Sequence, residues 1–401
     1  MKDEIKKIIK KAVGQNALDF SVEIPGDKNH GDYSTNVAMV LKKNPVEIAE
    51  KIKSDLFKKV EVKNGFINFF VADKFFIDNL KKIDKNYGKG EELKNKKIII
   101  DYTDPNPFKE FHIGHLMSNA IGESLSRIFE FQGAKVKRVC YQGDVGIHVA
   151  KAIWGKMRDK KLEWGQAYAF GAKFYEDDEN AKKEIITLNK KIYKRSDKNV
   201  NKLYDEGKKE SLKHFDEVYK KLDTKFDYFI FESQTGDIGK KIVEKGLKDG
   251  IFEKGENGAI IFKGEKYGLH TRVFINSDGL PTYEAKDLGL AEIKYKKYKY
   301  GKSVIITGNE VNEYFKVMLC AMEQINPDLA KKTKHIGHGM LRLPEGKMSS
   351  RTGKVITGES LIKKVEELIK EKIKDRELSE KDKKEIAETV AVGAIRYSIL
   401  K

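Results

Sequence analysis

Apolar residues follow two different periods along residues 98–133, and the change between them marks a strand, a loop and a helix. Residues 98–100 are three isoleucines, a short apolar run that predicts a buried strand. A loop with two prolines follows at residues 103–107, and apolar side chains then recur every three to five positions from Leu116 to Phe129. This spacing predicts an amphipathic helix that ends near Gly133. A loop between the carboxyl end of a strand and the start of a helix is where an α/β sheet binds its ligand.

The same alternation of strand and helix patterns recurs through most of the chain. Apolar or alternating runs predict strands at residues 135–141, 226–231, 259–262, 269–276 and 303–307, and helical spacing predicts helices at 238–248 and 283–295. This order favours an α/β fold with a Rossmann-like parallel sheet. Residues 151–225 depart from it, because they hold both tryptophans and dense charge at helical spacing. We interpret them as an inserted helical subdomain whose charged run, 199–221, is a solvated helix face.

Residues 1–88 are expected to form a separate small α+β domain. Helical patterns cover residues 3–13, 35–43 and 45–57. Two alternating runs then flank Asn64-Gly65, a strong signal for a β-hairpin. The lysines of this hairpin are candidate phosphate contacts or plain solvated lysines: Lys58, Lys59 and Lys63. A short linker runs from Gly88 through Lys97.

Composition narrows the class of protein. The chain has 401 residues and a net charge of +17, which favours a polyanionic partner, although a lysine-rich coding bias would raise the charge in the same way. No stretch is long and apolar enough for a membrane span, and the charged N-terminus has no signal-peptide core. The two cysteines, Cys140 and Cys320, lack metal-ligand spacing. We therefore expect a cytoplasmic protein without membrane contact, structural zinc or disulfides.

The start of the helix after the Pro-rich loop carries a candidate phosphate site. His112 and His115 bracket the predicted helix start, where free N–H groups and the helix dipole suit an anion. Gly114 lies between them and removes a side chain, so a flat ring or a phosphate could approach the backbone. The same four residues recur at 335–338, but no Pro-rich loop precedes them and no amphipathic helix follows. We assign no site to this second copy, which leads into an alternating run typical of a strand.

A second motif lies far along the chain. Residues 347–350 read Lys-Met-Ser-Ser, between glycines at 346 and 353. A lysine and two hydroxyl groups on a loop suit a pyrophosphate leaving group, because the cation neutralises developing charge and the hydroxyls donate hydrogen bonds. A solvated basic loop is the alternative for this segment taken alone.

The two motifs in this order resemble those of the class I aminoacyl-tRNA synthetases. Three more segments narrow the resemblance to the arginyl-tRNA synthetase family: Asp-Tyr-Thr-Asp-Pro-Asn at 101–106, Ser-Asp-Gly-Leu-Pro-Thr-Tyr at 277–283 with Lys286-Asp287, and Gly-Asp-Tyr-Ser-Thr-Asn at 31–36. The resemblance implies a class I catalytic domain over 98–357 and an N-terminal domain over 1–88 that contacts the elbow of the tRNA. Helices are predicted at 359–374 and 379–400, and residues 358–401 would begin a helical anticodon-binding domain. We expect most of that domain to be missing, as in a truncated product or one half of a two-chain enzyme.

The resemblance also implies roles in amino-acid activation. Histidines of the first motif would hydrogen-bond ATP phosphates, and the second motif would steady the pyrophosphate. Many family members lack the lysine of the second motif, and a lysine just before the first motif is thought to substitute; here Lys109 and Lys347 are both present. The implied catalytic residues are Lys109, His112, His115, Lys347, Ser349 and Ser350, and the implied ATP contacts are His112, Gly114, His115, Met340 and Lys347.

An arginine pocket calls for carboxylates, because a guanidinium donates paired, planar hydrogen bonds and stays charged. The implied arginine contacts are Asp101, Asn106, Asp144, His148, Tyr283, Asp287 and Asn309. The family tends to have Glu in place of Asp101 and can have Gln in place of Asn309. Three alternatives stay open: Asp101 as a loop cap, Asp287 paired with a lysine of its own helix, and His148 as a helix-start residue packing under its loop.

The implied partners are L-arginine, ATP with Mg²⁺ and tRNA(Arg), and a second chain would supply the anticodon-binding domain if the enzyme is split. No editing site is expected, because an acidic pocket rejects neutral side chains steeply. Two competing classes remain: another class I synthetase or nucleotidyltransferase, and a non-catalytic tRNA-binding paralogue.

Overall fold

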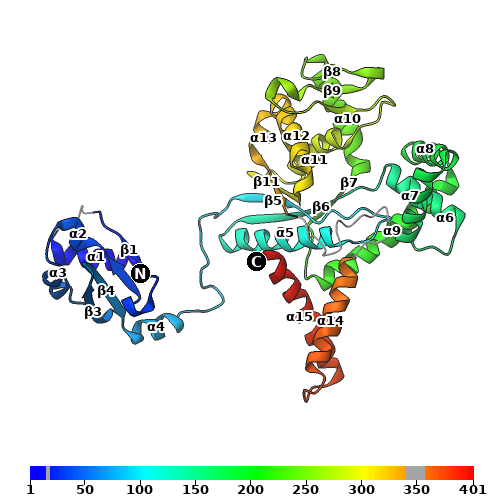
Figure 1. The fold of residues 1–401 in the computed structure, drawn as a ribbon. Helices are drawn as coiled ribbons and strands as arrows, with labels where there is room; N and C mark the ends of the chain where they lie inside the picture. Colours follow the sequence, from blue (N-terminus) through cyan, green and yellow to red (C-terminus); the bar gives the residue numbers. More distant parts are fainter. Residues whose placement is uncertain (15–18, 340–356) are drawn as a thin grey trace. The chain divides into compact units, whose positions relative to one another are not determined.

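A computed structural model describes residues 1–14, 19–339 and 357–401, which form two compact units, Met1–Lys89 and Gly90–Lys401 (Figure 1). The first unit contains a four-stranded antiparallel sheet in the order β1-β2-β4-β3. Its strands are β1 (Val22–Glu23), β2 (Tyr33–Thr35), β3 (Phe57–Lys63) and β4 (Phe66–Val71), and its helices are α1 (Lys2–Val13), α2 (Val37–Leu41), α3 (Pro45–Lys51) and α4 (Asp73–Leu80). A short 3₁₀ helix spans Lys28–His30.

The hairpin predicted around Asn64-Gly65 is confirmed. Both residues have positive φ, 53° and 78°, and they connect β3 to β4. The predicted helix over 45–57 is wrong at its end, because α3 stops at Lys51. Phe57 instead pairs with Val71, and its ring packs 4.7 Å from the buried ring of Phe69. Phe57 is therefore more stable in the core of the sheet than in a helix, and α3 ends earlier than the apolar spacing of residues 45–57 predicts.

The second unit is built on a five-stranded parallel sheet in the order β12-β11-β5-β6-β7. Its strands are β5 (Lys97–Asp101), β6 (Lys135–Gln142), β7 (Tyr228–Phe231), β11 (Lys302–Gly308) and β12 (Thr333–His338). This confirms the predicted Rossmann-like α/β fold. The strand order reverses between β5 and β11, so the site expected for a ligand in such a sheet lies where these two strands end.

Helices cover both faces of this sheet (Figure 1). On one face Ile99 and Ile305 share a core with α10 (Glu232–Lys248), α11 (Tyr283–Lys297) and α12 (Asn312–Ile325). On the other face Ile98 and Ile100 pack toward α5 (Ile113–Phe131). The long apolar run of β5 follows from this double covering. The remaining elements beside the first core are α13 (Pro327–Lys332), β8 (Glu253–Lys254), β9 (Ile260–Phe262), β10 (Arg272–Ile275) and the 3₁₀ helices Glu256–Gly258, Gly264–Tyr267 and Asn309–Val311.

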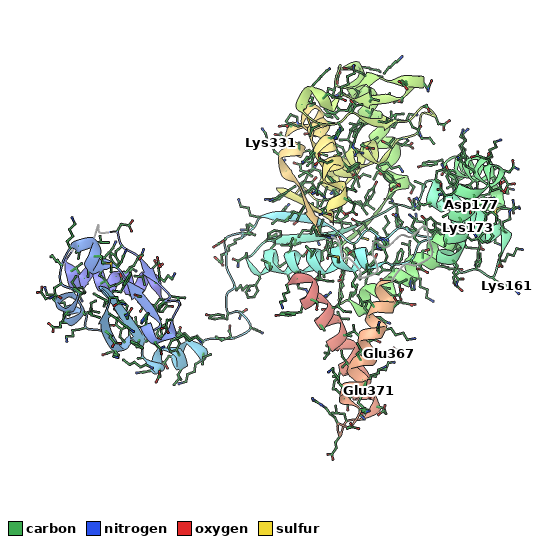
Figure 2. All side chains as sticks on the ribbon, in the orientation of Figure 1. Lys161, Lys173, Asp177, Lys331, Glu367 and Glu371 are labelled. Carbon is green, nitrogen blue, oxygen red and sulfur yellow. The ribbon has the colours of Figure 1, made fainter. Side chains whose placement is uncertain are left out.

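Four helices lie between β6 and β7, where the inserted helical segment was predicted. They are α6 (Ile147–Arg158), α7 (Trp164–Asp177), α8 (Glu179–Lys194) and α9 (Lys198–Lys221). Trp154 and Trp164 belong to their core, while Lys161, Lys173 and Asp177 are exposed (Figure 2). Helix α9 is not solvated all round, because Tyr204, Ser211 and Phe215 on one side of it are buried.

Two C-terminal helices, α14 (Gly358–Ile373) and α15 (Glu380–Leu400), form a hairpin at the α5 face of the sheet (Figure 1). Ile362 and Ile395 join a core with Phe111, Leu116 and Phe215. None of the described helices combines the length and apolar character needed to cross a bilayer.

Candidate active site

The loop that joins β5 to α5 is held in an unusual backbone conformation. Thr103, Asp104 and Phe108 all have positive φ, at 81°, 47° and 70°. Such a conformation is uncommon for residues with a side chain, and it persists where surrounding contacts impose it. Asp104 Oδ1 accepts the backbone N–H of Tyr141 at 2.7 Å, and the backbone N–H of Phe108 donates to Ser211 Oγ at 2.9 Å. The loop is thus fixed to β6 on one side and to α9 on the other.

Two histidines close the N-terminal end of α5. His112 Nδ1 accepts the N–H of Gly114 at 3.1 Å, and His115 Nδ1 accepts the N–H of His112 at 3.2 Å. The two imidazole rings stack with centroids 3.5 Å apart. A side chain on Gly114 would approach the His112 ring at 3.0 Å, so glycine suits the close turn between them. The N–H groups of Gly114, His115 and Leu116 are thus all bonded to His112 within this first turn.

Both imidazoles are neutral at physiological pH. Burial, with the charge of nearby Lys109, lowers the pKa of His112 to about 4. Burial, together with His112 and Lys109, also holds the pKa of His115 well below its usual range. Because each Nδ1 accepts a backbone N–H, the single proton of each ring lies on Nε2. The helix start therefore presents two uncharged N–H donors, which suits an anion such as phosphate.

Lys109 provides a cation close to these rings. Burial, opposed by Glu232 and reinforced by Lys151, lowers the pKa of Lys109 to about 8. Its Nζ lies 4.7 Å from the centroid of the Tyr168 ring. A desolvated ammonium interacts strongly with any anion that enters its surroundings.

Two of the predicted arginine contacts are carboxyl groups, of which Asp101 is buried and Asp287 is half-buried. Asp287 accepts the hydroxyl of Tyr314 at 2.6 Å, and burial raises the pKa of Asp287 to about 7. Asp101 Oδ2 pairs with Lys294 Nζ at 3.0 Å, while its Oδ1 has no hydrogen-bond partner among the residues that the structure describes. Burial and the neighbouring Asp101 carboxylate raise the pKa of Asp104 well above its usual range. Asp101 and Asp287 influence each other's charge, so both contribute negative potential to one region.

Three more predicted arginine contacts form hydrogen bonds that hold the loops following β6 and β7. Asn106 Oδ1 accepts the N–H of Gly143 at 2.9 Å, and His148 Nε2 lies 2.7 Å from the carbonyl oxygen of Gly143. Burial, reinforced by Lys109, lowers the pKa of His148 to about 3. Asp144 is fully buried and accepts four hydrogen bonds, from Tyr204 Oη, Lys208 Nζ, and the N–H and Oγ of Ser233. These side chains all bind other parts of the chain.

Tyr283 and Asn309 lie at the start of helices. Tyr283 is the first residue of α11, is exposed, and has Lys286 Nζ 5.2 Å from its ring centroid. Asn309 opens the 3₁₀ turn that follows β11. Tyr283 comes after β10 and Asn309 comes directly after β11.

A buried ion pair that the sequence reading did not identify lies in the same region. Glu232 Oε2 and Lys286 Nζ are 2.5 Å apart, and both side chains are buried. A side chain at Gly143 would collide with Asn106 Oδ1 and Glu232 Oε1. The Glu232–Lys286 pair therefore lies beside the loops that contain Asn106 and Gly143. Glu232 directly follows β7, and its place at the end of a predicted strand is the signal that could have revealed it.

Four predicted residues of the site lie outside the described residues: Met340, Lys347, Ser349 and Ser350. The chain on either side of that stretch is described. Thr357 forms an antiparallel bridge with His112, and the N–H of Gly358 donates to the carbonyl of Phe111 at 2.7 Å.

The second His-x-Gly-His copy lies within β12 rather than at a helix start. The ring of His335 stacks on Phe315 at 3.9 Å, and its Nε2 lies 2.7 Å from Thr307 Oγ1. Burial lowers the pKa of His335 to about 4. This histidine has a packing role at the edge of the sheet.

Within residues 1–14, 19–339 and 357–401, no group of three His, Cys, Asp or Glu side chains is arranged to hold a metal ion.

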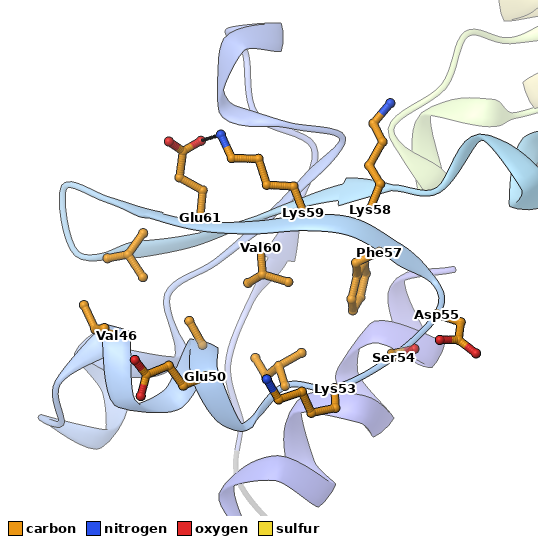
Figure 3. Close-up of a pocket in the computed structure, with 13 residues that line it drawn as sticks. Val46, Glu50, Lys53, Ser54, Asp55, Phe57, Lys58, Lys59, Val60 and Glu61 are labelled. Carbon is orange, nitrogen blue, oxygen red and sulfur yellow. Dashed lines mark hydrogen bonds and ion pairs between the residues drawn. The ribbon is translucent and has the colours of Figure 1, made fainter.

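The first unit has an open pocket between α3 and β3 (Figure 3). Lysines and carboxylates both line it. Lys59 Nζ lies 3.0 Å from Glu61 Oε2, and Lys58 pairs with Asp73 at 2.9 Å. All four side chains are largely exposed, so these ion pairs contribute little to stability.

Comparisons with known proteins agree over the whole chain. Residues 77–401 match a family model described as the catalytic domain of class I (R) tRNA synthetases, and residues 1–71 match one described as the arginyl tRNA synthetase N terminal domain. The chain is 31% identical to an arginine–tRNA ligase of Borrelia garinii, over 100% of this chain and 74% of that protein. It is 30% identical to one of Treponema denticola, over 95% of this chain and 70% of that protein.

Solved structures share the fold. The arginyl-tRNA synthetase of Plasmodium falciparum aligns with a TM-score of 0.63 at 21% identity, over 99% of this chain and 73% of that chain. The enzyme of Thermus thermophilus aligns with a TM-score of 0.62 at 17% identity, over 100% and 75%.

Proposed function

The chain belongs to the arginyl-tRNA synthetase family, and on this premise we propose that it is an arginine–tRNA ligase. It would activate L-arginine with ATP and then transfer the arginyl group to the 3′ end of tRNA(Arg). The observation that carries the proposal is the pairing of neutral Nε2–H donors at the start of α5 with buried carboxylates where β5 ends. Another class I synthetase and a non-catalytic paralogue are not favoured, because the curated relatives are arginine–tRNA ligases.

In the first step an oxygen of the arginine carboxylate attacks the α-phosphorus of ATP. The new P–O bond forms arginyl-adenylate, and the bond to the bridging oxygen breaks, so that pyrophosphate leaves with the electron pair. His112 and His115 would donate to phosphate oxygens, and the Lys109 ammonium would offset the charge that develops on them. Lys347, Ser349 and Ser350 would act on the pyrophosphate, and Met340 would contact the nucleotide.

The arginine guanidinium would be bound by the carboxylates of Asp287 and Asp101. Tyr283, Asn106 and Asn309 would complete the pocket. Asp144 and His148 would border it through the loop at Gly143, which both of them help to hold. Mg²⁺ would enter with the triphosphate of ATP, whose oxygens it prefers.

In the second step a terminal ribose hydroxyl of tRNA(Arg) attacks the carbonyl carbon of the adenylate, and AMP leaves. We propose that the first unit contacts the tRNA through exposed lysines such as Lys58 and Lys59, whose carboxylate partners are also exposed. Because aminoacylated tRNA is used in translation, we propose that the protein acts in the cytoplasm.

Arginine-dependent exchange of pyrophosphate into ATP tests the proposal, measured with and without tRNA. Exchange with arginine alone among the amino acids is expected, and His115→Ala and Asp287→Asn should each reduce it by about 100-fold or more. Lys173→Ala, on the exposed side of α7, serves as the matched control. Exchange that depends on another amino acid, or on none, would contradict the assignment. Exchange that required an added chain with anticodon-binding helices would support a two-chain enzyme.

A further inference from the structure

Thr103 lies between two predicted arginine contacts, Asp101 and Asn106, and its backbone is strained. Its φ of 81° is costly for a β-branched residue, whose side chain crowds the backbone there. The residue is buried. Contacts to its backbone or side chain must therefore hold the loop in this shape.

Two neighbouring residues of α5 provide these contacts. The backbone N–H of Thr103 donates to Ser118 Oγ at 3.2 Å, and Ser118 Oγ donates in turn to the carbonyl of Ile306 in β11 at 3.0 Å. Asn119 Nδ2 donates to Thr103 Oγ1 at 3.1 Å. Asn119 is fully buried, so a partner is also required at its amide oxygen.

That partner leads to the C-terminal helix. Thr224, in the turn after α9, has two acceptors for its single hydroxyl proton, Asn119 Oδ1 at 3.1 Å and the carbonyl of Leu222 at 3.2 Å. Donation to the nearer Asn119 Oδ1 completes the pairing of the buried amide. Arg396 of α15 donates from Nη2 to Thr224 Oγ1 at 3.4 Å and to the carbonyl of Leu222. Arg396, Thr224, Asn119 and Thr103 thus form a continuous series of hydrogen bonds, which we call the Arg396–Thr103 relay.

All three links of the relay donate in the same direction, from the charged guanidinium toward Thr103. Hydrogen bonds aligned in this way polarise one another, most strongly in a buried and water-poor region. Thr224, Asn119 and Thr103 are all buried. The buried apolar contacts of α15 come from other residues of the helix, among them Ala387, Ala391 and Ile395.

We propose that Arg396, Thr224 and Asn119 are positioning residues that let α15 set the shape of the arginine-binding loop. The effect of the relay on arginine binding rests on the proposed function, because the shape of the loop affects binding only if Asp101 and Asn106 contact arginine. The relay itself is a structural statement that can be tested without activity. Neither Arg396 nor Thr224 would touch substrate.

The first test compares Thr224→Val with Thr224→Ser in the full chain. Valine keeps the size of the side chain but removes the hydroxyl, and serine keeps the hydroxyl. We expect Thr224→Val to speed hydrogen–deuterium exchange in peptides covering residues 102–106, by about three- to tenfold, the range for one contact in a buried network. Thr224→Ser should restore slow exchange. Equal exchange in Thr224→Val and the unmodified chain would overturn the relay.

The second test measures catalysis. Arg396→Met and Thr224→Val should each raise the KM for arginine about three- to tenfold while the KM for ATP is unchanged, and the double variant should show no further rise. Lys384→Met, on the exposed side of the same helix, is the control. Equal losses in Thr224→Val and Thr224→Ser would show a packing effect and overturn the proposal. Should the unmodified chain lack arginine-dependent exchange, the proposed function would fail while the hydrogen-exchange test still decided the relay.

Discussion

At the scale of single residues, Asp287 makes arginine binding depend on pH. Its pKa is raised to about 7 by burial, and only its ionised form can pair with a guanidinium. Below pH 7 the Asp287 carboxyl holds a proton that must leave before arginine binds, so affinity should fall about tenfold per pH unit as the pH drops. Calorimetry at pH 6 and pH 8 measures this, with proton release at pH 6.

The control for this prediction is Asp287→Asn, which should bind arginine weakly at both pH values. His112 does not titrate in this range, since its pKa is about 4. Equal affinity of the unmodified chain at pH 6 and pH 8 would show that Asp287 does not govern binding.

Lys294 is the second residue with a measurable consequence. It is buried and pairs with the buried carboxylate of Asp101, so Lys294→Met would leave an uncompensated charge. The free energy of unfolding should fall by about 3–5 kcal/mol, measured by urea denaturation. Lys296→Met, exposed on the same helix, should change it little. Similar values for the two variants would contradict a structural role for the pair, and Asp101→Leu combined with Lys294→Met should recover much of the loss.

At the scale of elements, the position of α5 on the sheet depends on a glycine. A Cβ at Gly122 would lie 2.2 Å from Cγ of the buried Tyr102 ring, so Gly122→Ala must push the helix away. The expected loss of stability is about 1–3 kcal/mol. Gly393→Ala in α15 meets nothing within 4 Å and should stabilise the protein by about 1 kcal/mol instead. Thermal unfolding of both variants gives the comparison, and a loss in both would contradict it.

The sequence predicted most elements of the second unit, because their patterns reflect burial on two faces. The isoleucines of β5 and the spacing of α5 are examples. The start of α10 was predicted six residues late, at 238 instead of Glu232. Its first turns are polar because they face other polar groups, Glu232 toward Lys286 and Ser233 toward Asp144. Apolar periodicity cannot detect a helix whose buried side is polar.

The candidate site was predictable where one local pattern carried it and not where distant residues combine. His112 and His115 are three positions apart, and this local pattern, after the Pro-rich loop, indicated a helix start. The pairing of Glu232 with Lys286 and the relay from Arg396 to Thr103 join residues far apart in sequence. The distances between these residues depend on the strand order and on helix packing, neither of which can be read from local patterns in one sequence.

At the scale of the whole molecule, the division into two compact units predicts where proteases act first. Residues 81–89 are exposed and contain four lysines, while the N–H of Gly90 is already bonded to the carbonyl of Phe131. Limited trypsin treatment should therefore cleave early between Lys81 and Lys89, as read by mass spectrometry. The separated fragments should both keep their circular dichroism. Survival of residues 81–89 after the helices of the second unit are cut would contradict the division.

The strand order also governs when the protein can fold during its synthesis. β5 lies at the centre of the sheet, but its neighbour β11 begins at Lys302, two hundred residues later. At a synthesis rate of about 5–20 residues per second, the ribosome needs about 10–40 s to supply it. Through that interval one edge of β5 has no partner. The nascent chain then depends on early pairing with β6 and on α5, which shields Ile98 and Ile100 but not Ile99 on the other face. Chaperone demand should therefore peak in this window and end as β11 emerges.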